Sequence, residues 1–159
     1  TEAYARELFQ VWRPSVEPER VERLTTVRMA RQELLTVPNA PDLWIVLDEA
    51  VLRRKVGGAG VMREQLERLI SASELPNVTI QVVPFDGGAY VAMGSGFIVF
   101  DFPDPLDQSV AYLENLARGL YLEDPAEVTT CTIAFNHLRA AALPDHESAA
   151  LIRQVAKGM

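Results

Sequence analysis

The chain has 159 residues, 48% of them hydrophobic and 23% charged, which is typical of a folded domain and excludes an intrinsically disordered chain. This length suits a single domain that covers residues 1–159. The formal net charge of −7 opposes binding to a phosphate backbone, because nucleic-acid affinity comes largely from lysine and arginine, so DNA binding by this segment alone is not expected.

The first half of the chain predicts helices on either side of one strand. Apolar residues at spacings of three and four predict a helix over residues 1–12, and a second helix is expected from near Pro18 to about Leu35. Residues 42–47 are rich in aliphatic and β-branched residues and predict a buried strand that turns helical beyond its end. A further amphipathic helix is predicted over residues 61–73.

The second half predicts strands first and helices last. Three strands are expected over residues 77–85, 94–103 and 109–116, and their short or glycine-rich connections predict an antiparallel meander. Asp124, followed by a proline, predicts the start of a helix, and a last helix is expected from around Pro144. The predicted fold class is α+β, with an antiparallel sheet of three to five strands flanked by N-terminal and C-terminal helices.

A polar cluster follows the first predicted strand. Asp48 and Glu49 stand at the strand exit, with Arg53 and Arg54 after them. Two carboxylates can serve as acid and base when their surroundings separate their pKa values, and Glu114 in a later strand could face the same area. Adjacent residues of a strand point to opposite faces, however, so a salt bridge or a helix cap is the favoured interpretation.

Two loops give weaker signals. Residues 53–60, RRKVGGAG, precede a helix and could bind an anion, but they lack the spacing of a phosphate-binding loop, so an ordinary turn is favoured. Residues 86–96 combine glycines with Tyr90, Val91 and Met93. This loop could form an adaptable lip over a pocket or partner, or a long hairpin loop whose apolar residues pack back onto the sheet, and neither interpretation is preferred.

Other reactive residue types are sparse. The chain has one cysteine and two histidines, which cannot make a structural zinc site of Cys and His ligands, and no serine lies in a G-x-S-x-G motif. We therefore expect no metal, no cofactor and no catalytic residue. No apolar run approaches the length of a membrane helix, so we expect a cytoplasmic protein without membrane contact.

Several separated segments together resemble a known domain family. They are, in order, LWIVLDEAVLRRKVGG, MREQLERLI, PNVTIQVVPFDGGAY, AYLENL with GLYLEDPAEV, and FNHLRAAALP with HESAALI. Over nearly its whole length the chain is similar to the domain-of-unknown-function family 5753. The resemblance implies the C-terminal domain of an actinomycete transcription regulator whose N-terminal helix-turn-helix, of the xenobiotic-response-element (XRE) type, reads DNA. Because the chain opens at Thr1 within a helical pattern, we expect that reader to lie upstream, outside this chain.

The resemblance also implies a mode of control, without any established chemistry. The domain would control the DNA reader with a small protein encoded nearby, in an arrangement likened to toxin–antitoxin pairs. The recognisable polar positions of the family, together with Tyr90 of the glycine-rich loop, make up the expected ligand- or partner-binding set: Asp48, Glu49, Arg53, Arg54, Gln65, Tyr90, Tyr112 and Glu114. The chain departs from the family at Pro144 and Asp145, where a serine–proline helix start is usual, and this affects only a helix cap.

The leading hypothesis is a regulatory domain that binds a small-molecule effector or a partner protein and forms a homodimer, because helix-turn-helix proteins commonly bind two DNA half-sites as two-fold dimers. Two alternatives remain open. One is a small-molecule hydrolase or transferase that uses Asp48, Glu49 and Glu114. The other is a passive dimerisation module, from which a pocket of a few hundred cubic ångströms would distinguish the effector-binding domain.

Overall fold

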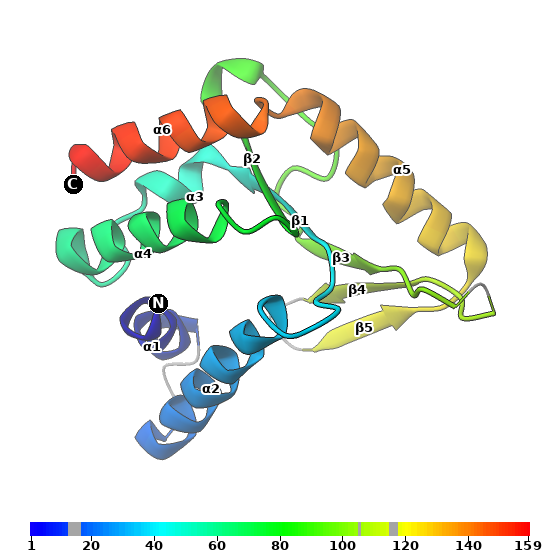
Figure 1. Cartoon of the computed structure of the whole chain (residues 1–159), viewed down its shortest axis with the longest axis horizontal. Coiled ribbons are helices and arrows are strands. Elements are labelled where there is room, and N and C mark those ends of the chain that lie inside the picture. Colours follow the sequence, from blue (N-terminus) through cyan, green and yellow to red (C-terminus); the bar gives the residue numbers. More distant parts are fainter. Residues whose placement is uncertain (13–16, 105, 115–117) are drawn as a thin grey trace. The chain divides into compact units, whose positions relative to one another are not determined.

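The structure, a computed structural model, describes residues 1–12, 17–104, 106–114 and 118–159 and divides into two compact units (Figure 1). Unit 1 comprises Thr1–Phe85 and Leu143–Met159, and unit 2 comprises Asp86–Ala142. The division describes packing within the chain. That residues 1–159 act as one regulatory domain stays a prediction.

Unit 1 is built from helices and one pair of strands. Its helices and strands are α1 (Glu2–Trp12), α2 (Pro18–Arg31), the 3-10 helix η1 (Gln32–Leu35), β1 (Leu43–Asp48), α3 (Glu49–Arg53), α4 (Gly58–Ala72), β2 (Val78–Val83) and α6 (Asp145–Lys157). The predicted helices over residues 1–12 and from Pro18 are confirmed, and so is the strand over residues 42–47 that turns helical.

The two strands of unit 1 pair in parallel, with Leu43 opposite Val78 and Asp48 opposite Val83. The prediction that residues 77–85 form the first strand of an antiparallel meander is therefore wrong. A parallel pair needs a crossover connection, and α4 supplies it between β1 and β2. Both faces of β2 are largely buried, as is usual in a parallel pair, although its sequence alternates like a half-buried strand.

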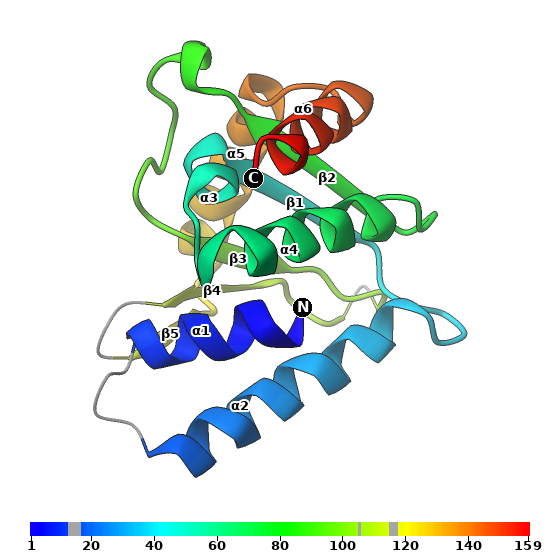
Figure 2. The ribbon, with the colours of Figure 1, turned by 90° about the vertical axis from the view of Figure 1, so that its left-hand side faces the viewer.

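The core of unit 1 lies between the strand pair and the helices α3, α4 and α6. Its most deeply buried side chains include Leu52, Met62, Leu66, Val82 and Ile152. Helices α4 and α6 lie side by side, and α6 also packs on β2 (Figure 2). A buried hydroxyl ties the last helix to the strands, since Ser148 accepts a hydrogen bond from the backbone N–H of Val82 at 3.0 Å.

Unit 2 holds a three-stranded antiparallel sheet and one long helix. Its elements are β3 (Phe97–Phe100), β4 (Val110–Glu114), β5 (Gly119–Leu122) and α5 (Pro125–Ala141), and the 3-10 helix η2 (Phe85–Gly87) stands where the chain enters it. The strand order is β3-β4-β5. The predicted α+β class, with an antiparallel sheet and helices at both ends of the chain, is confirmed.

Of two features of unit 2, the sequence predicts the cap of α5 but not strand β5. Asp124 caps α5, as expected, because its carboxylate accepts hydrogen bonds from the backbone N–H groups of Ala126 and Glu127. Strand β5 is not predicted, since GLYL is short and contains a glycine, which disfavours a strand.

The two faces of the unit 2 sheet differ. Residues alternate between faces along a strand, so Ala111 and Val99 share one face while Tyr112 and Ile98 share the other. Helix α5 packs against β3 and β4, and Ala111 is fully buried. The opposite face carries apolar side chains that stay exposed, among them Ile98, Phe100 and Tyr121.

Candidate functional site

The two carboxylates at the end of β1 both have structural partners. Asp48 is the N-cap of α3, and its Oδ1 accepts a hydrogen bond from the backbone N–H of Ala50 at 2.6 Å. Glu49 is only 5% exposed and pairs with the Arg53 guanidinium, Nη2 to Oε1, at 2.5 Å. Its other oxygen accepts the backbone N–H of Phe85 at 2.8 Å. The favoured interpretation, a salt bridge and a helix cap, is confirmed.

The basic residues after this pair extend outward. Arg53 is half exposed and lies over the ring of Phe85, with its Cζ atom 5.9 Å from the ring centroid. Arg54, the C-cap residue of α3, is exposed. Gln65 lies half-buried on α4, and its Oε1 accepts a hydrogen bond from the nitrogen of Thr1 at 2.5 Å. Arg53 and its partner Glu49 both belong to unit 1.

The remaining predicted residues belong to unit 2. Tyr112 on β4 stands opposite Tyr121 on β5, with ring centroids 4.8 Å apart. Glu114 is exposed at the end of β4, and Tyr90 is half-buried in the loop over residues 86–96. Since Asp48 and Glu49 belong to unit 1, the three carboxylates of the hydrolase alternative are divided between the two units.

Unit 2 contains a pocket of about 440 Å³ between α5 and one end of its sheet. Asp101 follows β3 and Ser109 precedes β4, so these two residues continue the register of the paired strands. The full lining consists of Asp101, Gln108, Ser109, Glu123, Pro125, Val128, Thr129, Thr132 and Ile133. All nine residues lie in unit 2, and two of them are carboxylates.

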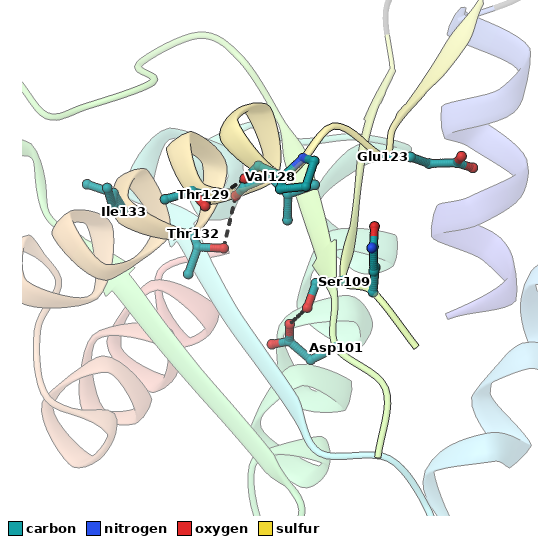
Figure 3. A pocket seen from close by; sticks show the side chains of 9 residues that line it. Asp101, Ser109, Glu123, Val128, Thr129, Thr132 and Ile133 are labelled. Atoms are coloured by element: carbon teal, nitrogen blue, oxygen red, sulfur yellow. Dashed lines mark hydrogen bonds between the residues drawn. The ribbon is translucent and has the colours of Figure 1, made fainter. Parts of the chain in front are cut away.

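Hydrogen bonds fix the orientation of several lining groups (Figure 3). On the strand side, the Ser109 hydroxyl donates to Oδ1 of Asp101 at 2.6 Å. On the helix side, the hydroxyls of Thr129 and Thr132 donate to the backbone carbonyls of Pro125 and Val128, at 2.6 Å and 3.0 Å. A serine or threonine hydroxyl has one hydrogen to donate, so each of these oxygens offers an incoming ligand only its lone pairs.

None of the eight residues predicted to bind a ligand or partner lines this pocket, and neither does the glycine-rich loop. Val91 and Met93 in that loop are exposed. The pocket residues escape sequence analysis because they come from three strand ends and one helix without forming a local motif. One local signal was available. The Asp124 cap predicts where α5 begins, and the spacing of four residues then places Val128 and Thr132 on the same face of this helix.

The described residues hold neither a group of metal ligands nor a membrane-spanning helix. In them, no three His, Cys, Asp or Glu side chains are grouped so that they could hold a metal ion. No helix within these same ranges has both the length and the apolar character that crossing a membrane requires. That the chain uses no metal or cofactor stays a prediction.

One comparison with known proteins gives a match. The model of the family described as "Domain of unknown function (DUF5753)" matches residues 1–154. No curated protein and no solved structure is significantly similar to the chain. Because the match covers nearly every residue, the chain belongs to the DUF5753 family.

Proposed function

We propose that this chain is the regulatory, effector-binding domain of a cytoplasmic helix-turn-helix transcription regulator. The observation that carries the proposal is the pocket of about 440 Å³ in unit 2. Small-molecule sites are concave, have volumes of a few hundred cubic ångströms, and combine apolar walls with a few polar groups. The pocket has this character, since its lining includes the apolar Val128 and Ile133 as well as the carboxylate of Asp101.

The DNA reader and the partners belong to the same proposal. The acidic chain is suited to regulation and not to DNA contact, so a helix-turn-helix of the XRE type, N-terminal to this domain, would bind the operator. A small protein encoded nearby would be a second input, as in antitoxin-like regulators of actinomycetes. Of the expected ligand- or partner-binding set, Arg54 in unit 1 and Glu114 in unit 2 have exposed side chains, and each would contribute to partner contact on its own unit.

Homodimerisation is the third part of the proposal. A two-fold dimer would place two DNA readers on two half-sites. We place its surface on the sheet face of unit 2 that α5 does not cover, where Ile98 is 50% and Tyr121 is 65% exposed. Contiguous exposed apolar side chains commonly mark protein–protein contact surfaces.

The hydrolase alternative receives no comparable support. Glu49 is held by Arg53 and by the N–H of Phe85, and Asp48 caps a helix. An acid or base must reach a substrate proton, and both carboxylates would have to give up structural contacts to do so. The passive dimerisation module differs from our proposal only in having no ligand in the pocket.

Co-purification tests the proposal. Thr129 is exposed and lines the pocket, whereas its neighbour Thr130 is exposed and does not line it. Both hydroxyls donate to a carbonyl one helical turn earlier, so Thr129→Lys and Thr130→Lys make the same chemical change on the same helix. Native mass spectrometry of chains purified from the native host should show one small molecule on the wild-type and Thr130→Lys chains and none on Thr129→Lys. Three ligand-free spectra would favour the passive module.

A further inference from the structure

We propose that the pocket of unit 2 selects an organic cation that carries ammonium groups on an aliphatic chain. This inference rests on the proposed function and names the chemical class of its effector. The lining contains two carboxylate residues, Asp101 and Glu123, and no lysine, arginine or histidine. The Asp101 carboxylate lies beside Ser109, whereas that of Glu123 extends away from α5 (Figure 3). A ligand that enters therefore meets negative charge without a compensating cation from the lining.

The uncharged polar groups of the lining also favour a ligand that donates hydrogen bonds. Ser109, Thr129 and Thr132 have each committed their only hydroxyl hydrogen, to Asp101 and to two helix carbonyls. Their oxygens can only accept hydrogen bonds from a ligand, and a carboxylate can only accept as well. Of the described lining side chains, Gln108 alone carries a donor that is not used in these bonds. A pocket of acceptors requires a ligand rich in donors, and an ammonium group has three N–H donors and a charge.

The pocket also lies beside the N-terminus of α5, which by itself would attract an anion. That attraction is already met within the chain. The Asp124 carboxylate accepts from two N–H groups of the first helical turn, and the Asp124 carbonyl accepts from the N–H of Val128. Glu127 adds a further negative charge in the same turn. An anionic ligand would meet carboxylates where a free helix terminus would offer N–H groups.

The apolar side chains of the lining favour a ligand with an aliphatic chain. Pro125, Val128 and Ile133 line the pocket between its polar groups, and Val128 is buried. Methylene groups of a ligand can pack on these side chains, which releases water from apolar surface. A bare inorganic cation would gain nothing from such walls, whereas a chain of methylenes with ammonium ends uses both parts of the lining.

Three probes of equal length test the class of ligand. They are 1,4-diaminobutane, the neutral 1,4-butanediol and the dianion succinate, each titrated calorimetrically into the whole chain at physiological ionic strength. We expect binding of 1,4-diaminobutane and no heat from the other two. Asp101→Asn keeps an acceptor for Ser109 and removes one charge, so it should weaken diamine binding about tenfold or more, as expected for loss of a charge-assisted hydrogen bond.

Matched variants separate pocket binding from general attraction to an acidic chain. Glu67→Gln removes one exposed carboxylate from α4 of unit 1 and should leave the affinity unchanged. Thr129→Lys should abolish binding by placing its own ammonium among the acceptors, and Thr130→Lys should not. Equal weakening by Asp101→Asn and Glu67→Gln would show general charge attraction and overturn the inference.

The inference and the proposed function fail differently. Binding of succinate or butanediol that Thr129→Lys abolishes would overturn the cationic class and leave an effector pocket standing. Absence of diamine binding at millimolar concentration would overturn the inference as well. In that case the co-purification experiment decides the proposed function, because it makes no assumption about the chemistry of the ligand.

Discussion

The Glu49 carboxylate, buried at the end of β1, pairs with the half-exposed guanidinium of Arg53 one helical turn later. The same carboxylate accepts the backbone N–H of Phe85, the last residue of the first segment of unit 1. A buried carboxylate is costly unless its oxygens are satisfied, and here both have partners. The Glu49 carboxylate therefore links the start of α3 to the segment that follows β2.

A double-mutant cycle measures what this pair contributes. Arg53→Gln leaves the buried Glu49 carboxylate without its cation, and Glu49→Gln keeps an acceptor for the N–H of Phe85. Because Arg53 is half exposed, we expect a coupling free energy of about 1–2 kcal/mol, below that of a fully buried pair. Urea unfolding of the wild type, both single variants and the double variant checks it. Additive effects would contradict an energetic link between the two side chains.

A second ion pair, between α1 and α2, predicts a pH dependence. Arg6 donates to both carboxylate oxygens of Glu22, at 2.6 Å and 3.0 Å, and this hydrogen bonding lowers the pKa of Glu22 from its ordinary value of 4.5. A lowered folded pKa gives stability that is present above pH 4.5 and is lost as the pH falls through the folded value. Carboxyl NMR titration should show the Glu22 pKa below 4.5, and Arg6→Gln should return it to that value. An unchanged pKa in Arg6→Gln would contradict this assignment.

Gly119 lies close to the Tyr112 ring, and this contact predicts that the effect of Gly119→Ala on stability changes sign when Tyr112 is replaced. The phenol ring of Tyr112 lies where a Cβ atom on Gly119 would stand. Gly119→Ala should destabilise the chain by about 1 kcal/mol, because the Tyr112 ring must shift from its tilted contact with Tyr121. In a Tyr112→Val background the same change should stabilise by about 0.5 kcal/mol, since alanine suits a strand better than glycine. Thermal unfolding of the four chains checks this, and the same sign in both backgrounds would refute it.

The proposed dimer surface makes a prediction that concentration can test. Ile98→Lys places a charge on the sheet face that α5 does not cover, and burying it in a dimer would be unfavourable. The dimer should dissociate at least about tenfold more readily, as loss of one buried aliphatic side chain implies. Val27→Lys, on α2, is the control because Val27 is 48% exposed. Sedimentation that shows a wild-type monomer at high concentration would remove the dimer from the proposal.

Helices and caps could be predicted from the sequence because their signals are local. The apolar spacing in residues 1–12 and the Asp124 cap before Pro125 each lie within a few turns of one helix. Pairing of strands depends on distant segments, so the parallel partnership of β1 and β2 could not be read from alternation in β2. The buried Gln81 shows why: its amide is satisfied by Trp44 and by the carbonyl of Leu143, and in sequence it looks like a solvent-facing residue.

Only the parts of the site that are close in sequence could be predicted. Asp48, Glu49 and Arg53 are adjacent in the chain, so a cap and a salt bridge could be anticipated. Asp101 and Thr132 are separated in the chain by β4 and β5, and they line one pocket because α5 packs back on β3 and β4. No spacing rule links them.

Operator binding tests the regulatory claim most directly. The measurement is the DNA affinity of the complete regulator, by fluorescence anisotropy, with and without the small-molecule fraction released from the purified wild-type chain. Coupling between two sites is reciprocal, so an effector that binds this domain must change DNA affinity if the domain controls the reader. We predict a change of at least about fivefold in wild type and Thr130→Lys and none in Thr129→Lys. Equal responses of the two lysine variants, or no response in any of the three proteins, would contradict the account.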